Sequence, residues 1–189
     1  MMAQSKLTSV ILGRPSIYSV PACVDPTDTN NWKLLHQGQN TICTGMYQAM
    51  TNLLMRNFDD WQPTTVVTGF GGDWDQAATA NQGSRQPPAF TDILVRKPIF
   101  YAPIVQVTPT TANRFYYVAI IRPDDGNTDA GDPTRPYINE LGLLAHNGTL
   151  LAHYVTPVTG SGSTATQYAK SNIEWLVIRW ELEFSGGLP

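Results

Sequence analysis

The sequence predicts a mostly β protein, an antiparallel β-sandwich with one packed α-helix at about residues 41–58 and long loops. Three observations point to this class. Apolar and polar residues alternate along the last third of the chain, and an Asn147-Gly148 dipeptide separates two apolar runs there. The 14 Pro and 15 Gly residues favour many turns and long connections. Only one stretch has convincing helical spacing.

Residues 137–154 are predicted to form a β-hairpin about Asn147-Gly148, because a type I′ turn needs φ > 0 at both central residues. A two-residue loop would pair Ala145 with Leu150 and Leu144 with Leu151. Side chains alternate between faces, so one face would be wholly apolar and the other mixed. The apolar face would hold Leu141, Leu143, Ala145, Leu150, Ala152 and Tyr154. The mixed face would hold Glu140, Gly142, Leu144, His146, Thr149, Leu151 and His153.

The strand predicted at 172–184 adds a second apolar face, formed by its even-numbered residues from Leu176 to Phe184. Residues 115–121 are apolar on both faces, which predicts a central strand. Shorter strands are expected at 66–70 and, interrupted by Pro98, at 93–101.

The helix is predicted from a single apolar stripe. Its members are Ile42, Met46, Ala49, Met50, Leu53 and Leu54. Thr41 is a plausible N-cap, and Pro63 prevents continuation beyond Trp61. The methionines of the stripe are interpreted as core packing between helix and sheet.

One domain is expected at 189 residues. Residues 1–30 contain scattered apolar positions and three prolines, so we predict an extended N-terminal arm that lies against its own domain or a neighbour. Residues 31–189 are predicted to form a single β-sandwich domain with the helix.

The composition indicates an assembled protein. Charged residues make up 14% of the chain, against about a quarter in ordinary domains, so much of the surface is expected to be buried in an assembly. The net charge of −3 and the scattered basic residues argue against nucleic-acid binding. Cys23 and Cys43 are expected to be reduced. No stretch approaches the ~18 apolar residues of a membrane span, so we expect a protein made and used without crossing a membrane.

No metal or cofactor is predicted. Asp125, Asn127 and Asp129 have the spacing of a calcium loop, but Ala130 and Pro136 stand where that loop needs Gly and Glu. In the predicted hairpin, His146 and His153 would lie about 13–14 Å apart, too far to share a metal.

No enzymatic activity is predicted either. The chain has no Gly-x-Ser-x-Gly elbow, and no local signature marks either cysteine as a nucleophile. Glu181 and Glu183 would lie about 7 Å apart on one strand face, within the inverting glycosidase range, but carboxylates on exposed strands are common.

The remaining candidates are contact residues. Leu144 and Leu151 lie on the mixed hairpin face with His146 and His153, which suggests contact with another sheet or subunit. Leu12 and Ile17 are candidates in the arm, and Trp74, in a Gly/Asp-rich turn, is a candidate for ligand contact. The candidate interface residues are Leu144, Leu151, His146, His153, Leu12, Ile17 and Trp74.

Several short signatures resemble virion proteins of tailed bacteriophages, especially the tail-collar fibre type and related neck, baseplate and fibre-attachment proteins. They comprise the helix after Asn40-Thr41, the stretch 67–72, the run Ile138-Asn139-Glu140-Leu141-Gly142-Leu143-Leu144 leading into 147–152, and the strand ending at Phe184. Leu144 stands where the family usually has Phe, and residues 146–148 replace its Asp-rich turn.

The resemblance implies a non-enzymatic, oligomeric structural part, often trimeric or in rings, made in the host cytoplasm and carried in the virion. Its partners would be other virion proteins and copies of itself. Two alternatives stay open: a capsid decoration (cement) protein, and a host-surface carbohydrate-binding module that uses Trp74 and the polar segment 76–90.

Overall fold

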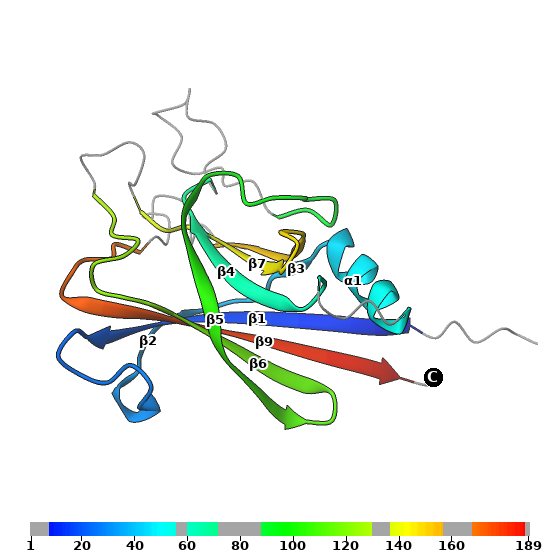
Figure 1. The fold of residues 1–189 in the computed structure, drawn as a ribbon, viewed down its shortest axis with the longest axis horizontal. Helices are drawn as coiled ribbons and strands as arrows, with labels where there is room; N and C mark the ends of the chain where they lie inside the picture. The colour runs from blue at the N-terminus through cyan, green and yellow to red at the C-terminus, as the bar shows by residue number, and fades with distance from the viewer. Residues whose placement is uncertain (1–7, 56–59, 72–87, 130–136, 157–167, 188–189) are drawn as a thin grey trace, which may run out of the picture.

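The computed structural model describes residues 8–55, 60–71, 88–129, 137–156 and 168–187 (Figure 1). The chain is mostly β with one α-helix, as predicted. The elements in order are β1 (Thr8–Pro21), the 3-10 helix η1 (Thr29–Asn31), β2 (Lys33–Gln37), β3 (Thr41–Ile42), α1 (Thr44–Leu54), β4 (Pro63–Gly69), β5 (Pro98–Thr111), β6 (Arg114–Ile121), β7 (Glu140–Ala145), β8 (Leu150–Val155) and β9 (Glu174–Gly187).

The described strands form a single curled antiparallel sheet rather than the two separate sheets of the predicted sandwich. Their order is β2-β1-β9-β6-β5-β4-β7-β8-β3. The long strand β5 joins the two halves, because Pro98–Pro103 pair with β4 whereas Ile104–Thr111 pair with β6. In Figure 1, β5 (green) runs from beside β4 down to beside β6.

The main core lies inside the curl, and both halves of the sheet contribute to it. Leu141 and Leu143 come from β7, and Ile178 and Trp180 come from β9. All four side chains are fully buried. The even-numbered face predicted for the last strand is therefore a core face. Helix α1 adds Met46, Ala49 and Met50 to the same core, as its stripe predicts. The helix begins later than the predicted residue 41, because Thr41 and Ile42 pair with β8 as β3 and Cys43, not Thr41, is the N-cap.

Residues 33–42 supply both edge strands of the sheet. β2 pairs with β1, and the next residues continue along β1, since Gly38 N and Asn40 N donate to the carbonyls of Pro15 and Gly13 at 3.0 Å each. β3 then pairs with β8 at the opposite end of the strand order. One short segment thus bridges the two ends of the sheet.

The N-terminal residues predicted as an arm include β1. They are extended, but Thr8–Pro21 lie inside the sheet between β2 and β9, paired with β9 along their whole length. The structure describes no residue before Thr8.

The β7–β8 hairpin forms, with its predicted pairing correct only away from the turn. Leu141 pairs with Tyr154, and Leu143 pairs with Ala152. Nearer the turn the register shifts, and Leu144 pairs with Leu150 instead of the predicted Leu151.

A three-residue loop causes this shift. Ala145 N donates to Thr149 O at 2.9 Å, and Gly148, with φ of 82°, occupies the left-handed position. The three-residue loop places Leu150 opposite Leu144 on the outer side, and a bulge at Leu151 restores the predicted pairing from Leu143 and Ala152 onward. Leu151 therefore packs in the main core, and Leu150 packs in a smaller outer cluster with Val67.

Candidate functional site

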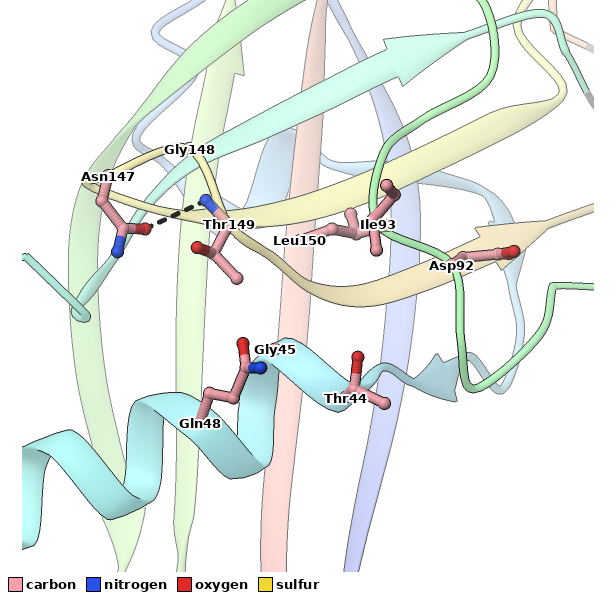
Figure 2. Close-up of a pocket in the computed structure, with 9 residues that line it drawn as sticks. All are labelled: Thr44, Gly45, Gln48, Asp92, Ile93, Asn147, Gly148, Thr149 and Leu150. Carbon is pink, nitrogen blue, oxygen red and sulfur yellow. Dashed lines mark hydrogen bonds between the residues drawn. The ribbon is translucent and has the colours of Figure 1, made fainter.

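A polar pocket of about 370 Å³ lies between the start of α1, residues 92–93 and the hairpin turn (Figure 2). Its volume is at the lower end of the range for small-ligand sites, about 300–1,000 Å³. The lining residues are Thr44, Gly45, Gln48, Asp92, Ile93, Asn147, Gly148, Thr149 and Leu150.

The wall formed by the turn is ordered by its own hydrogen bonds. Asn147 Oδ1 accepts from Thr149 N at 3.0 Å, and Gly148 N donates to Ala145 O at 3.0 Å. An asparagine side chain that bonds the backbone two residues later is a common turn-stabilising arrangement. The turn therefore presents a fixed polar edge to the pocket.

Asp92 connects the pocket to a buried acid–histidine network. His153 Nδ1 lies 2.6 Å from Asp92 Oδ2, and His153 Nε2 lies 2.7 Å from Glu140 Oε1. The side chains of His153 and Glu140 are fully buried, whereas that of Asp92 is 20% exposed. Both contacts are hydrogen bonds when His153 is an imidazolium between two carboxylates.

Backbone amides hold the second carboxylate in place. Glu140 Oε1 accepts from Arg96 N at 2.9 Å, and Oε2 accepts from Gly71 N at 3.0 Å. Burial acts to raise the pKa of Glu140, but the hydrogen bonds from His153 and from backbone amides outweigh it, and the net pKa is lowered. Arg96 Nη2 lies 3.7 Å from Asp92 Oδ2 and supplies a further positive charge.

This geometry favours a structural role for His153. Both ring nitrogens already face carboxylate oxygens, and the side chain has no exposed surface. A general base needs a free nitrogen within reach of its substrate. The network instead fastens residues 88–97 onto the sheet through Asp92 and the amides of residues 96–97.

Cys43 lies in the outer cluster beneath the same segment, with Val67, Val95 and Leu150. Burial, with a smaller contribution from the Asp92 charge, raises the pKa of the thiol to about 12. A thiol with this pKa is protonated at neutral pH and is a poor nucleophile.

Lys170 organises the acidic loop that contains Asp125, Asn127 and Asp129, whose sequence does not match a calcium-binding loop. Lys170 is 1% exposed, and its Nζ donates to Pro123 O at 3.0 Å, Asn127 Oδ1 at 2.9 Å and Ser171 O at 3.3 Å. Burial lowers its pKa, partly offset by nearby acidic side chains. The ammonium group thus occupies the place among these oxygens that a bound cation would take.

The predicted contact residues are scattered. Leu144 is half-buried on the outer side of the sheet, and Leu151 is in the main core. His146 is exposed at the turn, and His153 belongs to the buried network. Leu12 is half-buried in β1, Ile17 is fully buried, and Trp74 lies outside the described residues.

An apolar patch lies on the outer side of β4, β5 and β7. Pro103 pairs with Thr65, which also pairs with Leu144, and Tyr101 pairs with Val67, so these side chains share one face. The exposed fractions are 57% for Tyr101, Val105 and Leu94. We call the following five residues the outer patch: Leu94, Tyr101, Pro103, Val105 and Leu144.

Of the outer-patch residues, only Leu144 was predicted from the sequence to be a contact residue. Glu140 and His153 were assigned to one hairpin face, which the structure confirms by bonding them directly. Their third partner, Asp92, comes from a segment with no regular pattern, so the sequence carried no signal for it.

Comparisons with protein-family models, curated proteins and solved structures found no match for the chain. Among the described residues, no group of three or more His, Cys, Asp or Glu side chains is arranged to hold a metal ion. No helix in the described part of the chain is long and apolar enough to span a membrane.

Proposed function

We propose that the protein is a structural subunit of a tailed-bacteriophage virion, in the tail, collar or neck or at a fibre attachment, and that it acts by binding other proteins. The short signatures described above, from the helix to the terminal strand, suggest this class. The protein would be made in the host cytoplasm and carried in the particle.

The outer patch is the observation that carries the assembly role. It places exposed apolar side chains side by side, including Tyr101 and Leu94, which line one hollow of about 230 Å³. Contiguous exposed apolar surface marks interaction sites, because its exposure to water is unfavourable. The 14% charged content supports the same role.

The test is to purify particles of the phage that encodes the chain and look for the protein by mass spectrometry and electron microscopy. We expect it in the tail, collar or neck density in a fixed copy number. A position on the capsid surface would favour the decoration-protein alternative. Purified particles without the protein would refute a virion role.

A second candidate function, glycan recognition, is favoured by the polar pocket in Figure 2. Asp92, Gln48 and Thr149 offer hydrogen-bonding groups there, and the exposed rings of Tyr47 and Phe90 lie close by, with centroids 5.7 Å apart. A few polar groups beside an aromatic surface suit a sugar. A glycan array with wild type and Gln48→Ala tests this, and the absence of any sugar-dependent signal with wild type would exclude it.

A further inference from the structure

A row of charged and aromatic side chains lies on the face of β1, β9 and β6 that points away from the main core. These three strands are neighbours in the sheet (Figure 1). The even-numbered residues of β9 from Leu176 to Leu182 pack in the core, so Arg179, Glu181 and Glu183 lie on the opposite face.

Two arginines from the neighbouring strands neutralise the two glutamates of this row. Arg14 of β1 is the cross-strand partner of Glu181, and Arg114 of β6 is that of Glu183. Arg14 Nη1 lies 3.1 Å from Glu181 Oε1, and Arg114 Nη2 lies 2.9 Å from Glu183 Oε2. The two crossed pairs lie at 3.7 Å. These four charges balance one another, which leaves the row with the positive charge of Arg179.

Arg179 is held by aromatic rings instead of a carboxylate. Its guanidinium carbon Cζ lies 4.6 Å from the ring centroid of Tyr116 on β6 and 5.5 Å from that of Tyr18 on β1. Because β9 lies between β1 and β6, the two rings approach Arg179 from opposite sides. In the described part of the chain, no group accepts a hydrogen bond from the guanidinium of Arg179. The half-buried guanidinium is thus oriented, and its N–H groups are left for an external acceptor.

A guanidinium oriented in this way is suited to a carboxylate. Its planar fork of N–H groups donates two parallel hydrogen bonds to the two carboxylate oxygens, and each bond is strengthened by the opposite charges. Arginine and tyrosine are also among the residue types that contribute most of the binding energy in protein interfaces. The residues at this point therefore match a protein contact that centres on one ion pair.

The neighbouring charges favour a single carboxylate over a polyanion. Binding of a nucleic acid or a uronic-acid polymer depends on several positive charges that each neutralise a charge of the polymer. This row offers one, and Glu181 lies on the same face of β9 at roughly 7 Å along the strand. A second negative group close to the first would meet Glu181 and Glu183, whereas an isolated Asp or Glu side chain would meet Arg179 alone.

We propose that Arg179, held between Tyr18 and Tyr116 on the outer face of β1, β9 and β6, binds an Asp or Glu carboxylate of a partner protein. This role rests on the proposed assembly function and specifies the chemistry of one partner. It also places a second contact surface on the molecule, apart from the outer patch.

The experiment is a titration of the purified, isotope-labelled full chain with a capped Gly-Glu-Gly peptide, followed by NMR at the Arg179 Nε–Hε signal. Peptide concentrations up to about 10 mM detect a dissociation constant of about 1 mM. A capped Gly-Gln-Gly peptide is the uncharged control, and an oligogalacturonate tests an acidic sugar as the source of the carboxylate.

Three variants accompany the titration. Arg179→Gln removes the charge, and Tyr18→Leu removes one flanking ring while keeping the arginine. Arg122→Gln is the matched control, because Arg122 is an exposed arginine just after β6 and is not part of the row. Circular dichroism checks that each variant folds, and backbone amide signals near residue 179 report binding to Arg179→Gln.

We expect the Arg179 signal to shift and saturate with the Glu peptide and to stay unchanged with the Gln peptide. Arg179→Gln should weaken binding at least about tenfold, because it removes a charge-assisted bidentate contact. Tyr18→Leu should weaken it less, because the guanidinium keeps its charge but loses part of its orientation, and Arg122→Gln should leave it unchanged.

Three results would overturn the proposal: no saturable shift with the Glu peptide, an equal response to the Gln peptide, or equal weakening by Arg122→Gln. Tighter binding of the oligogalacturonate than of the peptide would overturn the protein partner and assign the site to an acidic sugar. The titration does not involve particles, so a chain that binds the Glu peptide but is absent from particles would refute the virion role alone.

Discussion

Two buried charged side chains fix connecting segments of the chain. Glu140 holds residues 96–97 and Gly71 through their backbone amides, and Lys170 holds the loop at Pro123–Asn127 through its ammonium group. Each charge is surrounded by several hydrogen-bond partners, which is the condition under which a buried charge is tolerated. Neither residue needs a ligand to account for its burial.

Glu140→Gln should lower the free energy of unfolding at pH 7 by about 3 kcal/mol, because its side-chain NH2 group would face backbone N–H donors that the carboxylate oxygens now accept from. The pKa of Glu140 is lowered from its ordinary value of 4.5, so the unfolded chain binds this proton more readily than the folded one. The contribution is therefore complete above pH 4.5 and is lost as the pH falls through the folded pKa.

Urea unfolding at pH 7 and again below pH 4.5 measures both effects of Glu140→Gln. Wild type should lose more stability on acidification than the variant does. Glu183→Gln, on a partly exposed strand face, is the control and should change stability by under about 1 kcal/mol. Equal acid sensitivity in wild type and Glu140→Gln would contradict the role given to this carboxylate.

At the scale of elements, close side-chain packing holds the segment 88–97 on the sheet in addition to its charged hydrogen bonds. Gly142 lies directly beneath Val95, and a Cβ on residue 142 would come within 2.3 Å of Val95 Cγ2. The glycine in β7 therefore lets the segment approach the sheet closely at this point. Val95 closes the outer cluster with Val67 and Leu150 at this point.

Gly142→Ala should destabilise the protein by about 1–3 kcal/mol, because the added methyl group overlaps Val95. Combining it with Val95→Ala should restore part of that loss, giving a coupling energy of at least about 0.5 kcal/mol in a double-mutant cycle. Unfolding curves of the four proteins supply the cycle. Strict additivity of the two changes would show that residue 142 and Val95 do not meet.

The hairpin turn supplies a separate test. Gly148 has φ of 82°, and a Cβ there would meet nothing within 4 Å, so a substitution suffers only from backbone strain. Gly148→Ala should cost about 1–2 kcal/mol in thermal unfolding, and Gly148→Asn less, because Asn tolerates the left-handed region. Equal losses for Ala and Asn would contradict this conformation.

How far the sequence leads differs from element to element. Hydrophobic periodicity predicts which face of a local element is buried. It therefore predicts the helix, the central strand 115–121 and the hairpin pairs that lie away from the turn. The turn was misassigned because Asn147-Gly148 suits a two-residue I′ loop as well as a three-residue loop with Gly in the left-handed position. The three-residue loop, together with the bulge at Leu151, exchanged the environments of Leu150 and Leu151.

Long-range features were beyond the reach of periodicity. The pairing of β1 with β9 joins residues over 150 positions apart, and nothing in 1–30 distinguishes an inner strand from an extended arm. The network around His153 depends on Asp92, 61 residues away along the chain. The outer patch arises because Leu94 and β5 come together in space, which the local sequence of neither segment indicates.

At the scale of the whole molecule, the sheet, the segment 33–42 and the acid–histidine network together position the outer patch. The curled sheet encloses the core, and the segment 33–42 bridges its two edge strands. The acid–histidine network fastens residues 88–97 over the outer cluster, and this holds Leu94 next to Tyr101 and Leu144. The buried charges thereby shape the surface that we propose for assembly.

The most direct measurement of this account is the incorporation of variants into phage particles. Particles assembled in cells that supply only wild type, only Leu94→Glu or only Ile173→Glu would be purified, and the bound protein quantified by mass spectrometry. Leu94 lies in the outer patch, whereas Ile173 is an exposed apolar residue outside it, just before β9. We predict that wild type and Ile173→Glu are present in equal amounts and that Leu94→Glu is reduced at least about tenfold, because a carboxylate enters an apolar contact. Particles that lack wild type, or that carry Leu94→Glu as abundantly as wild type, would contradict the account.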